Sequence, residues 1–548
     1  MKQDETPTLE TVYPVSCSVL DDSARGRIRA ALGADPSIDG FPDLLKAHIG
    51  RYGLPEFLPE LARLERAFDH SATGRRQIPP AADKLTVNPT VTLIPVSWSH
   101  LSRLIQPAGD TPPLRPQPGS CVVMIWKDPQ SGRTHIADGH AEDLLALKLV
   151  AEQIDIASAA RLENIAPGLL MQAIHHGISK GLLLSPPSKI RRDFTSKPPP
   201  LCETPDDYLT AGVFTLQWHI TQACDLHCRH CYDRSDRPPV PLNQGIAILD
   251  DFFDFCVQHH VRGQVTFTGG NPLLYPDFAH IYQAADERGF AIGILGNPSP
   301  KHRLESLLAI RRPVFFQVSL EGLEPHNDWI RGEGHFQRTL EFLNVLRDLD
   351  IYSMVMLTLT RDNIDQVLPL AEILTGRTNS FTFNRLSMVG EGANLMLPDK
   401  ETYQQFLQAY TAEAETNPML HLKDNLINIV RYQNGQSPMG GCTGFGCGAA
   451  FNFLTLLPDG EVHACRKFPS YLGNIFQQSL SDIYDSDSAD RYRRGSDACR
   501  NCRLRRVCRG CLATAHSFGL DIFTDRDPHC FLNKVTADGY PNTLDNSS

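Results

Sequence analysis

Apolar segments with the character of strands alternate with amphipathic helical segments between residues 212 and 400. The strand-like segments are residues 214–220, 264–268, 291–295, 314–319, 352–358 and 380–385. Helical periodicity separates them at residues 246–258, 278–288, 304–309, 336–349 and 364–374. This alternation predicts parallel strands joined by helical crossovers. We therefore expect an α/β fold, a partial (β/α)6 barrel over 212–400, with functional residues at the carboxyl ends of its strands.

Two regions of different pattern and a linker precede the barrel. Residues 1–85 have helical spacing, clearest at 41–49 and 58–64. Residues 86–185 change to short strands and then helices. The strands are expected at 90–94, 121–126 and 133–137, and the helices at 141–154, 158–165 and 167–180. Residues 186–211 are rich in proline and predict a semi-rigid linker.

Three further regions follow the barrel. We expect a helical bridge over 401–439, a cysteine-rich domain over 440–535 and a flexible tail over 536–548. The 15 cysteines gather mainly in 224–231 and 442–530. A secreted disulfide domain would be short and evenly rich in cysteine, so this distribution favours metal ligands in a reducing cytoplasm.

Charge and hydropathy exclude several kinds of partner. The 548 residues are 41% apolar and carry a net charge of −11, which argues against nucleic acid and against an anionic membrane as the main partner. No apolar run approaches the roughly 18 residues that span a bilayer. The first residues, Met1 to Thr6, are acidic and lack the apolar core of a secretory signal.

The first candidate for chemistry directly follows the first barrel strand. Cys224, Cys228 and Cys231 have the spacing C-x3-C-x2-C. Three thiolates in one loop can hold an iron–sulfur cluster by three of its four irons, whereas ordinary clusters of this type use four cysteines. An open iron would bind a ligand that is not protein. The alternative is a structural zinc loop completed by His227 or His230.

The spacing, with Tyr232 after the last cysteine, resembles the signature of the radical S-adenosylmethionine (radical SAM) enzymes. In that family SAM chelates the open iron through its amino and carboxylate groups. Downstream, Gly269-Gly270-Asn271-Pro272 is similar to the family's Gly-Gly-Glu-Pro segment, which contacts the SAM amino group. Asn271 replaces the acid, so it can accept a hydrogen bond but forms no charge-assisted pair.

The fourth barrel strand ends in a segment that resembles another family motif. Ser319-Leu320-Glu321-Gly322 is similar to Ser-Leu-Asp-Gly, with Arg331 downstream. The resemblance implies that Ser319 and Glu321 meet the ribose or methionyl part of SAM and that Arg331 meets its carboxylate. The alternative is a solvated loop acid with a surface arginine as its partner. Asn384 and Arg385 also end a strand and could touch SAM or substrate.

Eight cysteines beyond residue 440 are the number that closes two four-iron clusters. Their order resembles the SPASM domain of peptide-modifying radical SAM enzymes. The resemblance assigns a first cluster to Cys442, Cys447, Cys465 and Cys511. It assigns a second cluster to Cys499, Cys502, Cys508 and Cys530. The alternative is a pair of zinc ribbons.

Arg466 follows Cys465, where the sulfatase-maturing relatives carry an acid that serves as base. An arginine cannot deprotonate a substrate at neutral pH. This difference makes formylglycine formation unlikely and favours a carbon–sulfur bond or another peptide crosslink. Residues 86–185 resemble a winged-helix module that grips a leader peptide by strand addition. An architectural role for that region is the alternative.

Together these resemblances imply a cytoplasmic radical SAM enzyme with SAM and three [4Fe-4S] clusters. It would cleave SAM reductively and use the 5′-deoxyadenosyl radical to modify a ribosomally made precursor peptide, with flavodoxin or ferredoxin as electron donor. Similarity extends to the selenobiotic, or thio(seleno)oxazole-type, peptide maturases. The alternatives are a maturase that oxidises a side chain of a partner protein, and a non-catalytic iron–sulfur or zinc scaffold.

Overall fold

The computed structural model describes residues 8–32, 38–74, 76–79, 82–106, 115–163, 165–192 and 206–532. The chain forms two compact units, Met1–Pro187 and Ser188–Ser548. Half of the predicted linker, residues 193–205, and the whole predicted tail lie outside the described residues. The predicted boundary at residue 85 falls within the first unit, because the helices before it and the sheet after it share one hydrophobic core.

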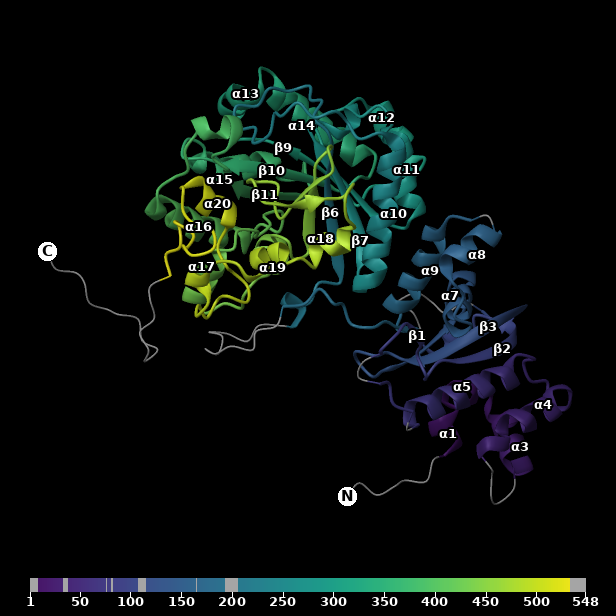
Figure 1. Cartoon of the computed structure of the whole chain (residues 1–548). Coiled ribbons are helices and arrows are strands. Elements are labelled where there is room, and N and C mark those ends of the chain that lie inside the picture. Colours follow the sequence, from purple (N-terminus) through teal and green to yellow (C-terminus); the bar gives the residue numbers. More distant parts are fainter. Residues whose placement is uncertain are drawn as a thin grey trace. The chain divides into compact units, whose positions relative to one another are not determined.

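The first unit is a three-stranded antiparallel sheet between two groups of helices (Figure 1). Its strands, in the order β2-β3-β4, are β2 (Thr92–Ser99), β3 (Gln117–Lys127) and β4 (Thr134–Asp138). The helices before the sheet are α1 (Leu9–Val12), α2 (Pro14–Val19), α3 (Asp22–Leu32), α4 (Phe41–Tyr52) and α5 (Leu58–Thr73). The later helices are α6 (Leu101–Ile105), α7 (Ala141–Ala151), α8 (Ile156–Glu163) and α9 (Pro167–Ser179).

Alternation along β3 explains this layering, since successive side chains of a strand point to opposite faces. Val123 and Ile125 pack into the core that contains α5, whereas Met124 and Trp126 pack against α7 and α9. Strand β2 extends past its predicted end because it is an edge strand, where Pro95 is tolerated. A short pair of strands, β1 (Thr86–Val87) and β5 (Leu183–Leu184), joins the two ends of the module.

The second unit is built on a nine-stranded sheet in the order β11-β10-β9-β8-β7-β6-β12-β13-β14. Its parallel strands are β6 (Val213–Thr221), β7 (Arg262–Gly269), β8 (Ala291–Leu295), β9 (Phe315–Ser319), β10 (Ser353–Leu359) and β11 (Ser380–Arg385). The helices beside them are α10 (Leu242–His259), α11 (Phe278–Glu287), α12 (Lys301–Leu308), α13 (Glu324–Arg331), α14 (His335–Asp348) and α15 (Val367–Leu374). The six predicted strand–helix repeats, and with them the partial barrel, are confirmed.

Strand β12 (Phe453–Leu456) pairs in parallel with β6 and so joins the cysteine-rich region to the barrel sheet. Two antiparallel strands, β13 (Glu461–His463) and β14 (Tyr471–Asn474), complete that edge. The remaining helices are α16 (Lys400–Ala414), α17 (Ile427–Gln433), α18 (Leu480–Tyr484), α19 (Asp487–Arg494) and α20 (Leu512–Ser517). The barrel and the cysteine-rich region also share one continuous core, which includes Trp218, Phe267 and Leu454.

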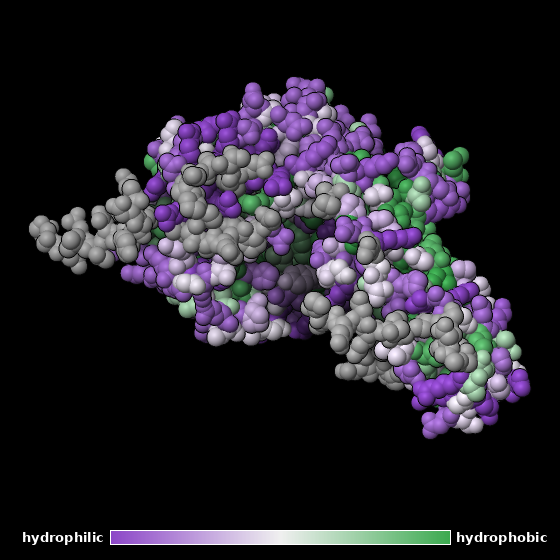
Figure 2. All heavy atoms as spheres, turned by 90° about the horizontal axis from the view of Figure 1, so that it is seen from below, coloured by the Kyte–Doolittle hydropathy of each residue, from purple (hydrophilic) through white to green (hydrophobic). Residues whose placement is uncertain are grey.

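Helices cover the outer side of the parallel strands, and the carboxyl ends of β6 to β11 lie along one edge of the sheet (Figure 1). The face of the molecule in Figure 2 is mainly hydrophilic, with hydrophobic residues in separate patches. Within the described part of the chain, no helix has the length and apolar character needed to cross a bilayer. Polar side chains converge at the carboxyl edge of the parallel sheet.

Candidate functional site

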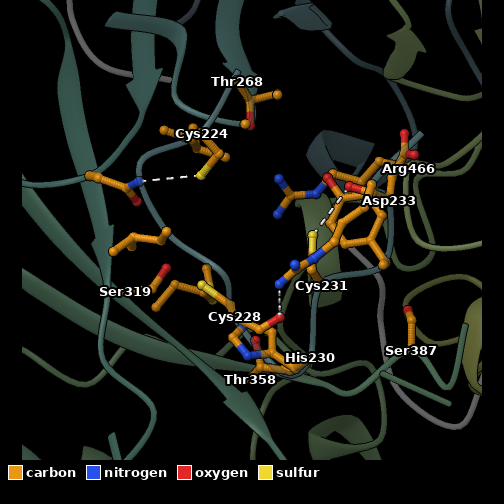
Figure 3. Close-up of a pocket in the computed structure, with 18 of the residues that line it drawn as sticks. Cys224, Cys228, His230, Cys231, Asp233, Thr268, Ser319, Thr358, Ser387 and Arg466 are labelled. Carbon is orange, nitrogen blue, oxygen red and sulfur yellow. Dashed lines mark hydrogen bonds between the residues drawn. The ribbon is translucent and has the colours of Figure 1, made fainter. Parts of the chain in front are cut away.

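A cavity of about 360 Å³ lies at the carboxyl ends of the parallel strands, within the size range of small-molecule sites. Cys224, Cys228 and Cys231 all line it, and Figure 3 shows their sulfur atoms around the same hollow. Ser319 at the end of β9 and Thr358 on β10 also line it, and Figure 3 shows them near Cys228 and His230. The structure thus brings the cysteine loop and the predicted strand-end residues to one site.

Close packing between the cysteine loop and the end of β7 fixes the position of the loop. The N–H of Gly270 donates to Thr221 O at 2.8 Å, and the N–H of Asn271 donates to Ala223 O at 2.7 Å. A Cβ atom on Gly269 would meet Thr221 O at 2.2 Å, and one on Gly270 would meet Ala223 O at 2.2 Å. Glycine is required here by the neighbouring backbone, and both glycines also line the cavity.

Each of the three sulfur atoms has a polar contact with the protein. The amide nitrogen of Asn297 lies 3.6 Å from Cys224 Sγ, and Arg331 Nη1 lies 3.7 Å from Cys228 Sγ. Cys231 Sγ donates to Asp233 O at 3.2 Å. Burial raises the pKa of the Cys228 thiol, and the charge of Arg331 opposes that effect. N–H donors beside a sulfur atom favour its thiolate form, which is the form that binds metal.

Glu321, predicted to meet SAM, does not itself line the cavity. Its side chain is 1% exposed and accepts hydrogen bonds from Arg331 Nη2 at 2.6 Å and from the N–H of Thr358 at 2.7 Å. Burial raises the pKa of this carboxyl, but the electrostatic effects of His230 and Arg331 outweigh it and hold the pKa below its ordinary value. Glu321 is therefore a buried carboxylate that positions Arg331, which does line the cavity.

Asn271 and Pro272 also lie outside the cavity lining. Asn271 is 3% exposed, and its side-chain oxygen accepts the N–H of Leu273 at 3.3 Å. Its amide nitrogen donates to Asp225 Oδ1 at 3.1 Å, and Asn297 donates to the same oxygen at 2.6 Å. The side-chain oxygen of Asn271, which was predicted to accept a hydrogen bond from SAM, thus already accepts one from the backbone. Its amide nitrogen holds the carboxylate of Asp225 in the cysteine loop. Sequence reasoning missed Asp225 and Asn297.

Tyr232 lines the cavity, and a buried histidine contacts its hydroxyl. Its hydroxyl lies 3.2 Å from Nε2 of His219. Burial lowers the pKa of His219 to about 3, so the ring is neutral and can accept this hydrogen bond. Burial also raises the pKa of Tyr232 to about 12, so the phenol keeps its proton near neutral pH.

A second cavity lies beside the first and is lined by the thiols of the first predicted auxiliary set, Cys442, Cys447, Cys465 and Cys511. The second set consists of Cys499, Cys502, Cys508 and Cys530. Burial raises the pKa of Cys499 and of Cys508, and the nearby thiols of the same set raise both further. Among the described residues, no three metal-binding side chains are close enough to hold one ion. A cluster whose irons each take one thiolate suits this wider spacing.

The two cavities share a wall. Asn384, Arg385, Arg466 and Lys467 line both of them. Arg466 lies beside Asp233 and Cys231 in Figure 3. The cysteine-rich region therefore supplies two cationic side chains to the barrel cavity. The spacing of the cysteines did not predict this contact.

Two family profiles match this chain. Residues 218–374 match the radical SAM superfamily, and residues 447–511 match SPASM, an iron–sulfur cluster-binding domain. The chain thus carries a radical SAM domain and a SPASM domain, which are the domains of an iron–sulfur enzyme. These domains imply SAM, one SAM-binding four-iron cluster and auxiliary clusters, and the converging thiols described above fit those groups.

Relatives with a known role share about a quarter of the aligned residues. The subtilosin biosynthesis protein AlbA of Bacillus subtilis is 25% identical over 49% of this chain, a match that spans only 59% of AlbA. The AdoMet-dependent heme synthase of Methanosarcina barkeri is 25% identical over 59% of this chain and 97% of its own. The mycofactocin maturase MftC of Mycolicibacterium smegmatis is 27% identical over 58% of this chain and 82% of its own.

Solved structures with a similar arrangement include Streptococcus suis SuiB bound to the precursor peptide SuiA. That chain is 16% identical, and the match has a TM-score of 0.49 and covers 75% of this chain and 96% of SuiB.

Replacing Gly270 by alanine is expected to displace the cysteine loop. The added Cβ meets backbone oxygens of Ala223 and Gln222 at 2.2 and 2.6 Å, which no side-chain movement relieves. We expect a loss of at least about 1–3 kcal/mol in unfolding free energy, together with reduced iron at the cysteine loop after reconstitution. Denaturant unfolding and iron analysis measure both. Gly212→Ala, where no atom lies within 4 Å of the new Cβ, is the control. Equal behaviour of the two variants would contradict this account.

Replacing Glu321 by glutamine leaves the buried charge of Arg331 without its partner. Breaking such a pair costs about 3–5 kcal/mol. The pKa of Glu321 in the folded protein is lowered, so the contribution of its charge to the unfolding free energy is full at neutral pH. That contribution is lost as the pH falls below the pKa of an unfolded glutamate, about 4.3, and through the lower folded pKa. The difference in unfolding free energy between wild type and variant should therefore shrink in acid. A difference that grows in acid would show that Glu321 is not the ionised partner.

Proposed function

We propose that this chain is a radical SAM enzyme that modifies a ribosomally made peptide through a bond or crosslink at cysteine or a neighbouring residue. The observation that carries the proposal is the open ring of three thiols in the barrel cavity, with a second thiol-lined cavity behind a shared wall. When bound, SAM and its cluster supply a 5′-deoxyadenosyl radical by one-electron reductive cleavage. The residues of the chain bind, orient and shield the reactants around that chemistry.

Cys224, Cys228 and Cys231 would hold the SAM-binding cluster, and the two sets of four cysteines would hold the auxiliary clusters. Ser319, Tyr232 and the backbone of Gly269 and Gly270 would line the SAM site. Arg331, fixed by Glu321, would bind a carboxylate there. Arg466 cannot act as a base, so a proton lost by the substrate must leave by another route. Flavodoxin or ferredoxin would supply electrons in the cytoplasm.

The first unit supports a peptide as substrate. Among the described strands β2 pairs with β3 alone, and Leu93 on it is 46% exposed, so the sheet has an edge to which an extended leader peptide could add. Relatives that are named for bacteriocin biosynthesis or for maturation agree with such a substrate. Within this class we place the chain nearest the selenobiotic peptide maturases. A porphyrin substrate, suggested by the heme synthase relatives, is the other outcome of the test.

The decisive experiment uses anaerobically reconstituted full-length protein. We expect about twelve irons with sulfide, four per cluster, and 5′-deoxyadenosine from SAM under strong reductant. Cys228→Ala should bind about four fewer irons and release no 5′-deoxyadenosine. Co-expression with a short cysteine-rich peptide encoded beside this gene, followed by mass analysis, should reveal a mass change. Zinc without sulfide would refute the proposal, and a modified porphyrin would replace the peptide.

Asp225, like Asn271, does not itself line the cavity, but it accepts a hydrogen bond from Asn297, which does, so its carboxylate would orient Asn297 toward SAM. Asp225 Oδ1 is held by Asn271 and Asn297, next to the sulfur of Cys224. Because hydrogen bonds to charged groups contribute about 1.5–3 kcal/mol, Asp225→Asn should weaken SAM binding about tenfold or more, as measured by equilibrium dialysis. Adding Asn271→Glu should restore it. Asp236→Asn, on an exposed residue of the same segment, should leave the affinity unchanged. An affinity unaffected by Asp225→Asn would remove Asp225 from the site.

A further inference from the structure

Arg385, the last residue of β11, is the centre of a buried ion cluster in the wall between the two cavities. Its side chain is 1% exposed. Its two terminal nitrogens pair with the two carboxylate oxygens of Asp527 at 2.8 and 2.7 Å, and its Nε pairs with Asp424 at 2.9 Å. The guanidinium also lies over the ring of Tyr403 at 5.2 Å. One buried cation is thus shared by two carboxylates.

Asp527 holds the backbone of two cysteines that belong to different sets. Its Oδ2 accepts the N–H of Cys511 at 2.8 Å. Its carbonyl oxygen accepts the N–H of Cys530 at 2.9 Å. Cys511 belongs to the first auxiliary set and Cys530 to the second, so one residue fixes a ligand of each. Arg385 in turn fixes Asp527 to the barrel strand.

Cys442 and Cys465, also of the first set, are connected to the Arg385 ion cluster through neighbouring residues. Asn425, next to Asp424, accepts the N–H of Cys442 at 2.7 Å. Lys467, two residues after Cys465, donates to the carbonyl oxygen of Arg385 at 3.2 Å. Ligand segments that are far apart in the sequence therefore meet at one buried arginine.

We propose that Arg385 and Asp527 are positioning residues that set the reduction potentials of both auxiliary clusters and hold the first cluster against the wall of the radical cavity. This rests on the proposed function, because it takes the two cysteine sets as cluster ligands. Net charge and hydrogen bonding around a cluster govern its potential. The same contacts would fix how far the first cluster lies from a substrate radical in the barrel.

The charges predict the sign of each effect. One arginine and two carboxylates give the buried cluster a net charge of −1. Asp527→Asn brings it to zero, which favours the added electron and raises the potentials. Arg385→Met leaves −2 and lowers them. A loss of packing alone would open the clusters to water in both variants and would move the potentials in one direction. Opposite shifts therefore separate an electrostatic role from a structural one.

The test is a redox titration monitored by electron paramagnetic resonance on reconstituted full-length protein. Replacing Cys224, Cys228 and Cys231 by alanine removes the SAM-binding cluster, so that only the auxiliary clusters report. We expect higher midpoint potentials for Asp527→Asn, lower ones for Arg385→Met, and values near wild type for Arg385→Lys, which keeps the charge. Iron and sulfide analysis establishes that each variant is loaded.

Two further variants keep the test decisive. Asp424→Asn removes the other carboxylate without touching the hydrogen bonds to Cys511 and Cys530, and it should also raise the potentials. It therefore replaces Asp527→Asn in the test if that variant does not load iron. Asp459→Asn, in the partly exposed pair with Arg237 at 2.6 Å, is the matched control and should cause no shift. Unchanged potentials, or shifts of one sign in all variants, would overturn the inference. SAM cleavage would survive that result, whereas wild-type protein without auxiliary iron would contradict the proposed cofactors.

Discussion

A buried charge must be neutralised where it lies, and this constraint shapes the floor and the wall of the barrel cavity. Glu321 and Arg331 form one such pair at 2.6 Å, and Arg385 with Asp424 and Asp527 forms the other group. Removing a charge from water costs several kcal/mol unless a partner and hydrogen bonds compensate. Each group therefore needs its partners in place before the chain packs around it. These paired charges therefore fix the positions of Arg331 and Arg385 in the cavity lining.

The second constraint is the contact of backbone with backbone. Strand β7 and the cysteine loop approach so closely at Gly269 and Gly270 that even a methyl group would overlap a carbonyl oxygen. Two hydrogen bonds to the strand end fix the backbone that leads into the cysteine loop. The two glycines thus allow the strand end to pack against the segment that leads into the cysteine loop. The same packing leaves both glycines in the cavity lining.

Much of this architecture can be read from the sequence, because periodicity and short spacings report local structure. The six parallel strands follow from alternating apolar and helical segments, whereas the division of the eight cysteines into two sets rests on the resemblance to the SPASM domain. The pairing of β12 with β6 joins segments more than 200 residues apart, and a four-residue strand carries no sign of its partner. Asn297 and Lys467 reach the cavity by the same kind of long-range contact. The burial of Glu321 could not be predicted, because a motif gives position in the chain but not burial.

The shared wall links the chemistry of the two cavities. Asn384 and Arg385 come from the barrel, Arg466 and Lys467 from the cysteine-rich region, and all four line both sides. A thiolate-ligated cluster carries negative charge, so cations beside it make reduction easier. Arg466 and Lys467, the two cations of this wall that lie outside the Arg385 ion cluster, would favour an electron leaving a substrate radical for the auxiliary side. Since β12 continues the barrel sheet, the distance across that wall is set by strand pairing rather than by a mobile connection between domains.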